Sequence, residues 1–403
     1  MLTAGRLGKT FEHMNPLSFD RTRLPSPHLN DSHAAWRRTV RGFVDKEIAP
    51  HVNAWDEEGK FPRELHRRAA DIGLLGLGYP EEFGGVRDGV DIFHSIIASE
   101  ELARAGSGGL VAGLMTHGIG LPPVLALGSD ELKARIAPDV LAGKKLIALC
   151  VTEPSGGSDV ANLKTRARRE GDFFVVNGEK TFITTGMRAD YLTVAVRTGG
   201  PGAAGLSFLL IDADSPGVTR TKLDKMGWWM SDTASINFAD VRVPADNLIG
   251  AENSGFAGIV ANFNGERLGM AAQAIAFARV CIEDAAAWAT ARETFGKPLS
   301  KHQVIRHKFA EMLRHAHAST ALLDHCAWRV RNGETPVAEL SLLKVQATRT
   351  MEFCAREAMQ ILGGAGFMRG CRVERIYREV RVMAIGGGSE EIMLDLAGRQ
   401  MGV

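Results

Sequence analysis

The sequence lacks three features that would each narrow its class: an excess of one charge, a clustered set of cysteines and a long apolar run. Its 48 Lys and Arg residues nearly balance 47 Asp and Glu residues, which leaves a formal net charge of +1 over 403 residues. This balance gives no overall attraction toward nucleic acid or an anionic membrane. No apolar run reaches the roughly 18 residues that a membrane span needs. We therefore expect neither a nucleic-acid partner nor a membrane span.

The cysteines are widely scattered and form neither a CxxC nor a CxxH pair: Cys150, Cys281, Cys326, Cys354 and Cys371. Zinc sites usually show such pairs, so no metal site is expected. An odd, unclustered set is typical of free thiols in a reducing compartment. The expected location is cytoplasmic, of the bacterial type, with the mitochondrial matrix as the alternative.

The first 30 residues are polar and hold three prolines. Arg6 and Lys9 precede the first acidic residue, Glu12, which is compatible with a mitochondrial transit peptide. The simpler interpretation is a poorly ordered arm, or an upstream start with Met14 as a second candidate. We expect a poorly ordered N-terminal arm over residues 1–30.

Hydrophobic periodicity divides the remaining chain into three parts. Apolar residues recur at helical spacing in the first part, in segments 36–48, 62–72, 92–104, 110–120 and 130–141. Residues 31–145 are therefore expected to form an N-terminal helical domain.

The second part changes period at residue 146. Short alternating or β-branched runs cover residues 174–176, 181–184, 191–196, 206–211 and 234–243, separated by glycine, proline and aspartate turns. Asn177-Gly178 is a hairpin signal. The spacing predicts a small antiparallel barrel or sandwich over residues 146–250. No strand is followed by GxGxxG and a helix, which disfavours a Rossmann domain.

Long segments of helical period return in the third part, over residues 256–292, 301–331 and 337–362, with Pro298 and Pro336 between them. Such helices joined by short loops predict a four-helix bundle over residues 251–403. The fold class is therefore α+β, with helical, β and helical domains in that order.

Residues 149–159 form the most informative motif, Leu-Cys-Val-Thr-Glu-Pro-Ser-Gly-Gly-Ser-Asp. A strand-like apolar run stops at Thr152, and the proline and glycines that follow allow a tight turn. Thr152, Ser158 and the freed backbone N–H groups can face an anionic or heteroaromatic ligand. An ordinary glycine-rich turn would explain this segment alone, so the later motifs decide between the two interpretations.

Four later motifs follow in order: Lys-Thr-Phe-Ile-Thr-Thr-Gly at 180–186, Arg-Glu-Thr-Phe-Gly-Lys at 292–297, Gln-Ile-Leu-Gly-Gly-Ala-Gly at 360–366, and Gly-Gly-Gly-Ser-Glu-Glu-Ile at 386–392. Together the five motifs resemble the acyl-CoA dehydrogenase family of flavoenzymes, from about Asp31 to the C-terminus. The resemblance implies FAD as cofactor and an acyl-CoA as substrate. It also implies an electron-transferring flavoprotein as electron acceptor and a homo-oligomer, usually a tetramer.

The resemblance assigns FAD contacts to a set of residues from all five motifs: Leu149, Val151, Thr152, Gly157, Ser158, Phe182, Ile183, Thr184, Arg292, Phe295, Gln303, Gln360, Gly363, Gly364, Ser389 and Glu391. Phe182 stands where tryptophan is common. Strand alternation puts Phe182 and Thr184 on one face, while packing in the barrel core is the competing interpretation of Phe182 and Ile183. Arg292, Phe295 and Gln303 match positions that reach the FAD of a neighbouring subunit. Arg292 has the planar fork that binds phosphate oxygens, although a solvated arginine at a helix end is the alternative.

The reaction implied by the resemblance removes an α-proton from a thioester, so it needs a carboxylate over the Cα–Cβ bond. Many family members supply it from Glu-Gly-Thr near the C-terminus, where this chain has Gly387-Gly388-Ser389. A minority, including the isovaleryl- and long-chain-type enzymes, use a Glu-Arg pair on an earlier bundle helix. Glu266-Arg267 matches that pair, so Glu266 is the predicted catalytic base. A surface carboxylate is the alternative, but apolar neighbours at 263, 268 and 270 predict partial burial.

Substrate contacts are assigned by the same resemblance. Arg267 matches a residue that binds the pantetheine or phosphate part of CoA, and Ser158 and Asn264 are weaker candidates. A backbone N–H at Gly387 would polarise the thioester carbonyl. Trp228 and Trp229 either wall the acyl or pantetheine channel or pack between domains.

The predicted function is FAD-dependent oxidation of a saturated acyl-CoA to the trans-2-enoyl-CoA, with the β-hydride passing to flavin N5. An acyl-CoA oxidase or a flavin monooxygenase relative on the same fold is one alternative. The chain is short for a two-bundle oxidase, and Glu266 argues against a monooxygenase. A flavin- and CoA-binding protein without turnover is the other alternative. The base position weakly favours branched or bulky acyl chains.

Overall fold

The computed structural model describes residues 15–403, apart from the side chains of residues 257 and 259–264. The chain forms two compact units. The helical unit comprises the described part of residues 1–44 together with residues 92–108 and 267–403, and the sheet unit comprises residues 45–91 and 109–266.

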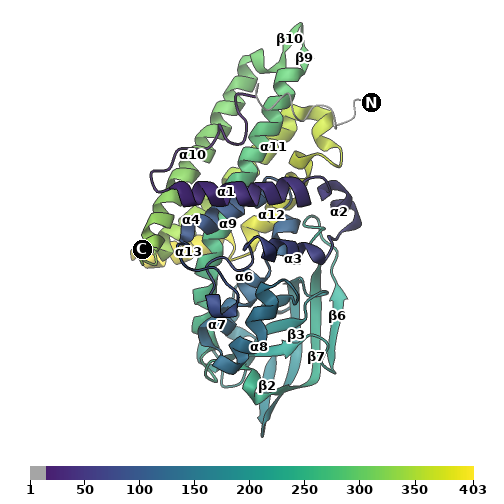
Figure 1. The fold of residues 1–403 in the computed structure, drawn as a ribbon, viewed down its shortest axis with the longest axis vertical. Helices are drawn as coiled ribbons and strands as arrows, with labels where there is room; N and C mark the ends of the chain where they lie inside the picture. Colours follow the sequence, from purple (N-terminus) through teal and green to yellow (C-terminus); the bar gives the residue numbers. More distant parts are fainter. Residues whose placement is uncertain (1–14) are drawn as a thin grey trace. The chain divides into compact units, whose positions relative to one another are not determined.

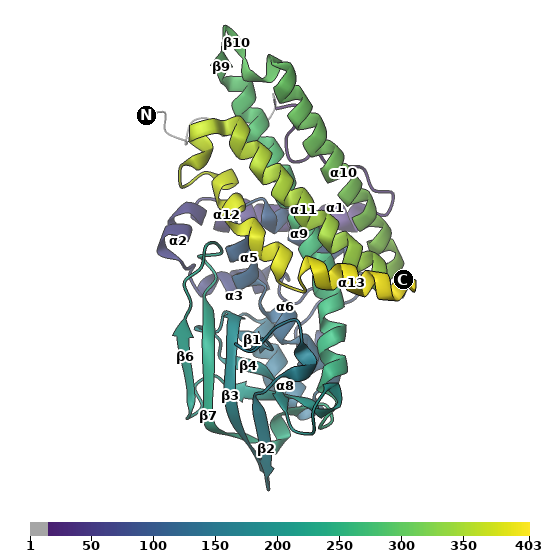
Figure 2. The same cartoon turned by 180° about the vertical axis from the view of Figure 1, so that it is seen from behind.

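The helical unit is built from long helices (Figure 1). They are α1 (Asp31–Phe43), α4 (Ile92–Ala103), the later part of α9 (Gly255–Ala291), α10 (Gln303–Arg331), α11 (Val337–Leu362), α12 (Arg372–Ile385) and α13 (Glu390–Met401). A two-stranded hairpin, β9 (Glu293–Thr294) and β10 (Lys297–Pro298), links α9 to α10. Figure 2 shows α10, α12 and α13 around α11, which packs against all three. The helical bundle predicted from the periodicity is confirmed.

Residues 15–30, expected as part of a poorly ordered arm, run along the helical unit and bury Asn15, Phe19 and Thr22; residues 1–14 lie outside the described residues. Phe19 is 3% exposed. Its backbone N–H donates to Glu283 Oε1 at 2.8 Å, and Arg279 Nη2 donates to its carbonyl at 2.6 Å. The Arg279 guanidinium also lies 4.0 Å from the Phe19 ring centroid. Arg279 and Glu283 on α9, about 260 positions further along the chain, therefore hold this polar segment in place.

The sheet unit combines short helices with an eight-stranded sheet. The helices are η1 (Val44–Ile48), α2 (Val52–Glu58), α3 (Glu64–Asp71), α5 (Gly108–Leu114), α6 (His117–Gly120), α7 (Pro122–Leu127) and α8 (Asp130–Leu141). The strands are β1 (Ile147–Cys150), β2 (Arg166–Glu170), β3 (Phe173–Thr184), β4 (Tyr191–Arg197), β5 (Leu206–Asp212), β6 (Val218–Lys222), β7 (Thr233–Pro244) and β8 (Leu248–Ile249). The segment 110–120, expected as one helix, is broken between α5 and α6.

The strand order is β6-β7-β3-β2-β4-β5-β8, with β1 beside β4. Figure 1 shows β6, β7 and β3 side by side. Most pairs are antiparallel as expected, but β1 and β4 are parallel, as are β2 and β4 at the single pair Arg166–Arg197. Parallel strands need a crossover connection, and the chain between β1 and β4 provides one through β2 and β3. The sheet is therefore mixed rather than purely antiparallel.

Alternation along β4 and β5 buries both faces of the sheet. Leu192 and Val194 enter one apolar cluster, whereas Ala195 and Phe208 enter a second cluster shared with α7 and α8. Strands covered on both faces read as nearly continuous apolar runs, which explains the composition of residues 191–196 and 206–211.

The expected hairpin turn at Asn177-Gly178 is wrong, because both residues lie inside β3. The register of β3 against β7 shifts between Val176 and Gly178, so the pair forms a bulge. Asn177 Nδ2 donates to Asp240 Oδ1 at 3.0 Å across the bulge. A Cβ at Gly178 would lie 2.6 Å from the Thr165 Cα, so the position admits only glycine without rearrangement.

All five cysteines are free, and only Cys371 is not fully buried. Across residues 15–403, no single helix is long and apolar enough to cross a membrane. Among these residues, only the bent pair Gly108–Leu114 and His117–Leu127, with 53° between its halves, has the length and apolar composition of a possible span.

Candidate active site

The predicted glycine turn follows β1 in the sheet unit. Glu153 and Gly156 exchange two backbone hydrogen bonds of 3.2 and 3.0 Å, which closes a tight turn. Gly156 has φ +155°, a value that side chains disfavour. Gly157 and Ser158 are exposed, Thr152 and Leu149 are half-buried, and Val151 is buried. The turn therefore presents its backbone and the Ser158 hydroxyl to solvent, as a ligand-binding loop requires.

A buried ion pair anchors this turn to the sheet. Lys180 Nζ lies 2.8 Å from Glu153 Oε1 and donates to the Val151 carbonyl at 3.0 Å. The Lys180 side chain is 0% exposed and that of Glu153 is 3% exposed. The N–H groups of Lys164 and Thr165 also donate to the Glu153 carboxylate, at 2.6 and 2.9 Å. The carboxylate thus joins the turn to β3 and to the segment just before β2.

The charges of this pair oppose the effect of burial. Burial lowers the pKa of Lys180 in spite of the attraction of Glu153. For Glu153, burial favours the neutral acid, but the ammonium of Lys180 and the hydrogen bonds from Thr165 and Lys164 outweigh it and hold the pKa below its ordinary value. Sequence reasoning did not single out this pair. Phe174, Val176 and Lys180 all fall on alternate, buried positions of β3. A lysine at such a position was the feature of the sequence that could have predicted a buried ion pair.

Phe182 lies two residues after this anchor and is 69% exposed. Its φ is +59°, in the left-handed region that bulky residues rarely adopt. The register of β3 shifts between Lys180 and Ile183, so the segment is bulged rather than regular. Thr181 still donates its N–H to the Thr152 carbonyl at 2.9 Å. An exposed aromatic ring thus lies beside the glycine turn, and a residue held in an uncommon conformation suggests a functional constraint.

The side chain of Ile183 is 2% exposed and belongs to the apolar cluster of the sheet. The core interpretation therefore holds for Ile183 and fails for Phe182. Only the backbone of Ile183 remains a candidate for ligand contact. Thr184 is half-buried and does not belong to this cluster, so a shared face for Phe182 and Thr184 stays a prediction.

Trp228 and Trp229 are half-buried and packed within the sheet unit. The Trp229 indole N–H donates to the Lys225 carbonyl at 2.9 Å, and Lys225 Nζ donates to the Trp228 carbonyl at 2.8 Å. A Cβ at Gly109 would lie 2.7 Å from Trp228 Cα. These contacts support a packing role for the loop.

Glu266 and Arg267 are consecutive on α9, where the chain passes from the sheet unit to the helical unit. Glu266 is half-buried, as expected, and its Oε2 atom is shielded from solvent. Arg267 is 7% exposed, and its Nε donates to the Gly387 carbonyl at 3.2 Å. The side chain of Asn264 lies outside the described residues. Arg267 was predicted to bind CoA, but it is buried and engaged with a glycine loop of its own chain.

That glycine loop joins α12 to α13. Gly387 has φ +67° and Gly388 has φ +107°. A Cβ at Gly387 would lie 2.7 Å from Met270 Sδ. The usual family position of the base is thus held in a conformation and a space that suit glycine.

Ser389 and Glu391 follow the loop. The Ser389 hydroxyl accepts from the Ile392 N–H at 3.4 Å and caps α13. A backbone hydrogen bond and the Ser389 hydroxyl lower the pKa of Glu391, which is exposed. Glu390 pairs with Arg349 Nε at 3.0 Å. These local roles make neither glutamate a good candidate for the base.

The remaining predicted cofactor residues are exposed and lie in two places in the helical unit. Arg292, Phe295 and Gln303 lie around the β9–β10 hairpin, and Phe295 is 97% exposed with φ +51°. Gln360, Gly363 and Gly364 are exposed where α11 gives way to η7 (Gly363–Phe367).

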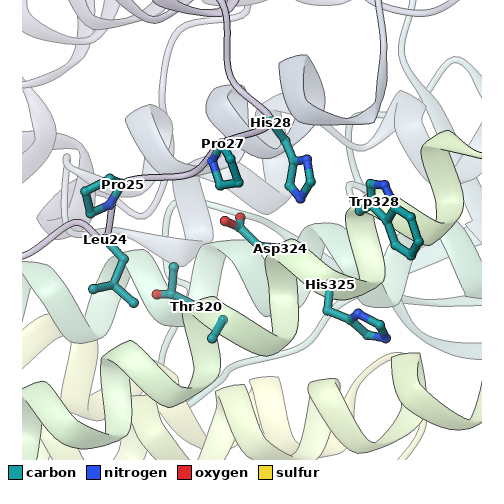
Figure 3. Close-up of a pocket in the computed structure, with 9 residues that line it drawn as sticks. Leu24, Pro25, Pro27, His28, Thr320, Asp324, His325 and Trp328 are labelled. Carbon is teal, nitrogen blue, oxygen red and sulfur yellow. The ribbon is translucent and has the colours of Figure 1, made fainter.

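A cavity of about 330 Å³ lies between residues 24–28 and α10 (Figure 3). Its lining includes His28, Asp324 and Trp328. Burial raises the pKa of Asp324. None of the predicted site residues lines this cavity.

Comparison with known proteins assigns the family. Three acyl-CoA dehydrogenase domain families match along the chain: the N-terminal domain at residues 30–144, the middle domain at 148–241 and the C-terminal domain at 253–402. The chain belongs to the acyl-CoA dehydrogenase family. It is therefore an oxidoreductase of the three-domain acyl-CoA dehydrogenase fold, as the motifs predicted.

Individual family members match over nearly the whole chain. Acyl-CoA dehydrogenase AFT10-1 of Alternaria alternata is 38% identical over 97% of this chain and 95% of its own. The crystal structure of a probable acyl-CoA dehydrogenase from Mycobacterium abscessus superposes with a TM-score of 0.90 at 50% identity, covering 92% of this chain and 99% of that one. A glutaryl-CoA dehydrogenase from Mycobacterium smegmatis in complex with FADH2 has a TM-score of 0.87 at 28% identity, covering 95% and 96%.

The acyl-CoA dehydrogenase family binds FAD, and the residues of the sheet unit fit such a group. The exposed Phe182 ring offers a flat surface for a planar ring system. The exposed backbone at Gly157 and the hydroxyls of Thr152 and Ser158 offer hydrogen bonds beside it. Chemistry and exposure therefore agree with the cofactor of the family.

Proposed function

We propose that this chain is an FAD-dependent dehydrogenase that converts a saturated acyl-CoA to the trans-2-enoyl-CoA. One observation carries the choice of chemistry: the chain has a half-buried glutamate at 266 on α9 and a glycine, not a glutamate, at 387. A thioester dehydrogenase needs one carboxylate for the α-proton, and this combination supplies it from the helix. When bound, FAD supplies the acceptor for the β-hydride.

Glu266 takes the α-proton onto its carboxylate. Shielding of Oε2 keeps water away from this group, so the carboxylate is poised for the substrate rather than for bulk solvent. The N–H of Gly387 donates to the thioester carbonyl oxygen and stabilises the negative charge that develops there. Ser158 and Asn264 are further candidates for substrate contact. Arg267 acts on the substrate through the loop that it holds.

The cofactor is held by groups from several parts of the chain. Phe182 and Thr184 contact the ring system, and the turn at 156–158 binds the pyrophosphate through backbone N–H groups. The exposed set Arg292, Phe295, Gln303, Gln360, Gly363 and Gly364 serves the cofactor of a neighbouring subunit in a homotetramer. Electrons then leave through an electron-transferring flavoprotein.

Anaerobic mixing with a panel of straight and branched acyl-CoAs tests the proposal. Acid precipitation should release about one FAD per chain, and at least one thioester should bleach the flavin absorbance. Reoxidation by an electron-transferring flavoprotein, faster than by oxygen, separates a dehydrogenase from an oxidase. A folded, colourless protein that cannot be reconstituted with FAD would refute the proposal, as would a flavin that no acyl-CoA reduces.

A further inference from the structure

Lys344 lies within α11 and is 0% exposed. Its ammonium donates to the Ala384 carbonyl at 3.2 Å and to the Gly388 carbonyl at 2.6 Å. Ala384 lies in the last turn of α12 and Gly388 in the glycine loop that leads to α13, and α11 packs against both helices. Burying an ammonium costs several kcal/mol before its partners compensate. An apolar residue could fill the space without that cost, so the charge calls for an explanation beyond packing.

The joint between α12 and α13 is a run of three glycines, Gly386 to Gly388. Gly386 closes the last turn of α12 by donating its N–H to Val382 O at 2.8 Å. Gly387 and Gly388 then both adopt positive φ. Glycine takes this conformation without a steric clash, but it loses more conformational entropy on folding than any other residue. Arg267 holds the carbonyl of Gly387, while Lys344 holds that of Gly388. Two buried cations therefore fix consecutive carbonyl groups of the loop.

Because the peptide units are planar, holding the Gly387 and Gly388 carbonyl groups also restricts the orientation of the N–H groups in the same loop. The N–H of Gly387 lies between the closed turn of α12 and the carbonyl held by Arg267. It has no acceptor among the described residues. An N–H that stabilises an oxyanion must already be about 2.7–3.1 Å from the place where the charge develops. A two-glycine loop without external restraint would not keep that position.

We infer that Lys344 is a positioning residue for thioester recognition: its ammonium holds the 386–388 loop so that the Gly387 N–H meets the substrate carbonyl. The inference rests on the proposed function. It assigns to α11 a part in substrate activation that none of the sequence motifs indicated.

A pair of ligands that differ at the carbonyl separates positioning from general stability. A 3-thia-acyl-CoA keeps the thioester carbonyl but cannot undergo the normal oxidation. An S-alkyl-CoA of equal chain length has a methylene there instead. Calorimetric titration of the holoenzyme gives both affinities. For Lys344→Met, the affinity for the 3-thia-acyl-CoA should fall about ten-fold, the loss of roughly one well-placed hydrogen bond. The affinity for the S-alkyl-CoA should change less than about two-fold.

Met351→Ala is the matched control. Met351 is also fully buried on α11, two turns beyond Lys344, and its truncation destabilises the core. The ratio of the two affinities should stay at the wild-type value in this variant. If Lys344→Met does not fold, the same titrations on Lys344→Gln decide the point, because the shorter amide cannot reach both carbonyls.

Each outcome has one meaning. Selective loss of the thioester ligand supports the inference. An equal loss of both ligands, or an unchanged ratio, overturns it while leaving the proposed function intact. A wild-type protein that binds neither ligand overturns the proposed function itself.

Discussion

The ammonium of Lys180 lies 2.8 Å from the carboxylate of Glu153, and both side chains are buried in the sheet unit. Removing one partner of such a pair leaves an uncompensated buried charge, whereas removing both does not. This asymmetry makes the anchor of the glycine turn testable by substitution.

Lys180→Met should lower the free energy of unfolding by roughly 3–5 kcal/mol and weaken FAD retention. The double variant Lys180→Met/Glu153→Gln should recover part of the stability. Urea unfolding and the flavin content after gel filtration measure the two effects. Lys145→Met is the control, because Lys145 meets Asp190 at 3.1 Å in a pair whose side chains are 43% and 20% exposed, and a solvent-accessible pair is worth about 0–1 kcal/mol. Equal losses in the two lysine variants would contradict the anchoring role.

Glu266→Gln keeps the shape of the side chain and removes the base. Turnover should fall by about 10²–10⁴-fold, the usual range for general-base catalysis. FAD content and acyl-CoA binding should remain, because the glycine turn and the Arg267–Gly387 contact are untouched. The rate of flavin reduction in a stopped-flow instrument is the direct measurement. Near-wild-type reduction would show that Glu266 is not the base, and Glu390 and Glu391 would then be tested.

Moving the base to the commoner family position requires the Met270 side chain to give way. In Glu266→Gly/Gly387→Glu, the new Cβ would meet Met270 Sδ at 2.7 Å, and a side chain at φ +67° costs about 1–2 kcal/mol. We expect little recovery in this double variant and more when Met270→Ala is added. Steady-state kcat with the best acyl-CoA compares them, with Met270→Ala alone as control. Equal activity with and without Met270→Ala would exclude the steric explanation.

Two buried histidines of the sheet unit should make stability fall in mild acid. Burial lowers the pKa values of His66 and His117 to about 4. In the unfolded chain a histidine titrates near 6.5, so between about 6.5 and 4 only the unfolded state takes up the proton. Each histidine should therefore cost about 3 kcal/mol of stability as the pH falls through this window.

The variant His117→Gln should flatten this dependence in urea unfolding at pH 4 to 7. The exposed His307→Gln should leave it unchanged. A wild-type free energy of unfolding that is flat over this range would contradict the assignment.

Phe295→Asp should weaken subunit association. The Phe295 ring is 97% exposed on the β9–β10 hairpin, and a charge in an apolar interface is costly to desolvate. We expect a shift from tetramer to smaller species in sedimentation velocity, with loss of FAD. Met226→Asp, at a 64% exposed residue of the sheet unit, should leave the assembly unchanged. An active, FAD-saturated monomer would rule out the shared cofactor site.

Hydrophobic periodicity was sufficient to predict the long helices. The helices α8 and α11 have the residue limits that their apolar spacing predicted, 130–141 and 337–362. The irregularities in the pairing of β3 with β7 could not be predicted from the sequence in the same way. Asn177-Gly178 has the composition of a hairpin turn, but the pairing of Asn177 with Asp240 across the sheet draws it into a strand. Phe182 likewise leaves the regular alternation because the register shifts beside it.

The candidate site was likewise predictable only where a local sequence pattern marks it. Motifs located the glycine turn, the exposed aromatic ring and the Glu-Arg pair, because each is a local pattern. The partners of Lys180, Lys344 and Arg267 are distant in sequence and include backbone carbonyls, which leave no trace in residue identity. The order of residues 15–30 depends in the same way on Arg279 and Glu283.

The cysteine thiols differ in exposure, so one of them can be labelled selectively. Burial raises the pKa values of Cys150, Cys281, Cys326 and Cys354, so these thiols stay protonated and shielded from electrophiles. Cys371 is half-buried at the start of α12. A maleimide dye should therefore attach at one defined point per chain in the folded protein, and would report on the helical unit without any cysteine being replaced.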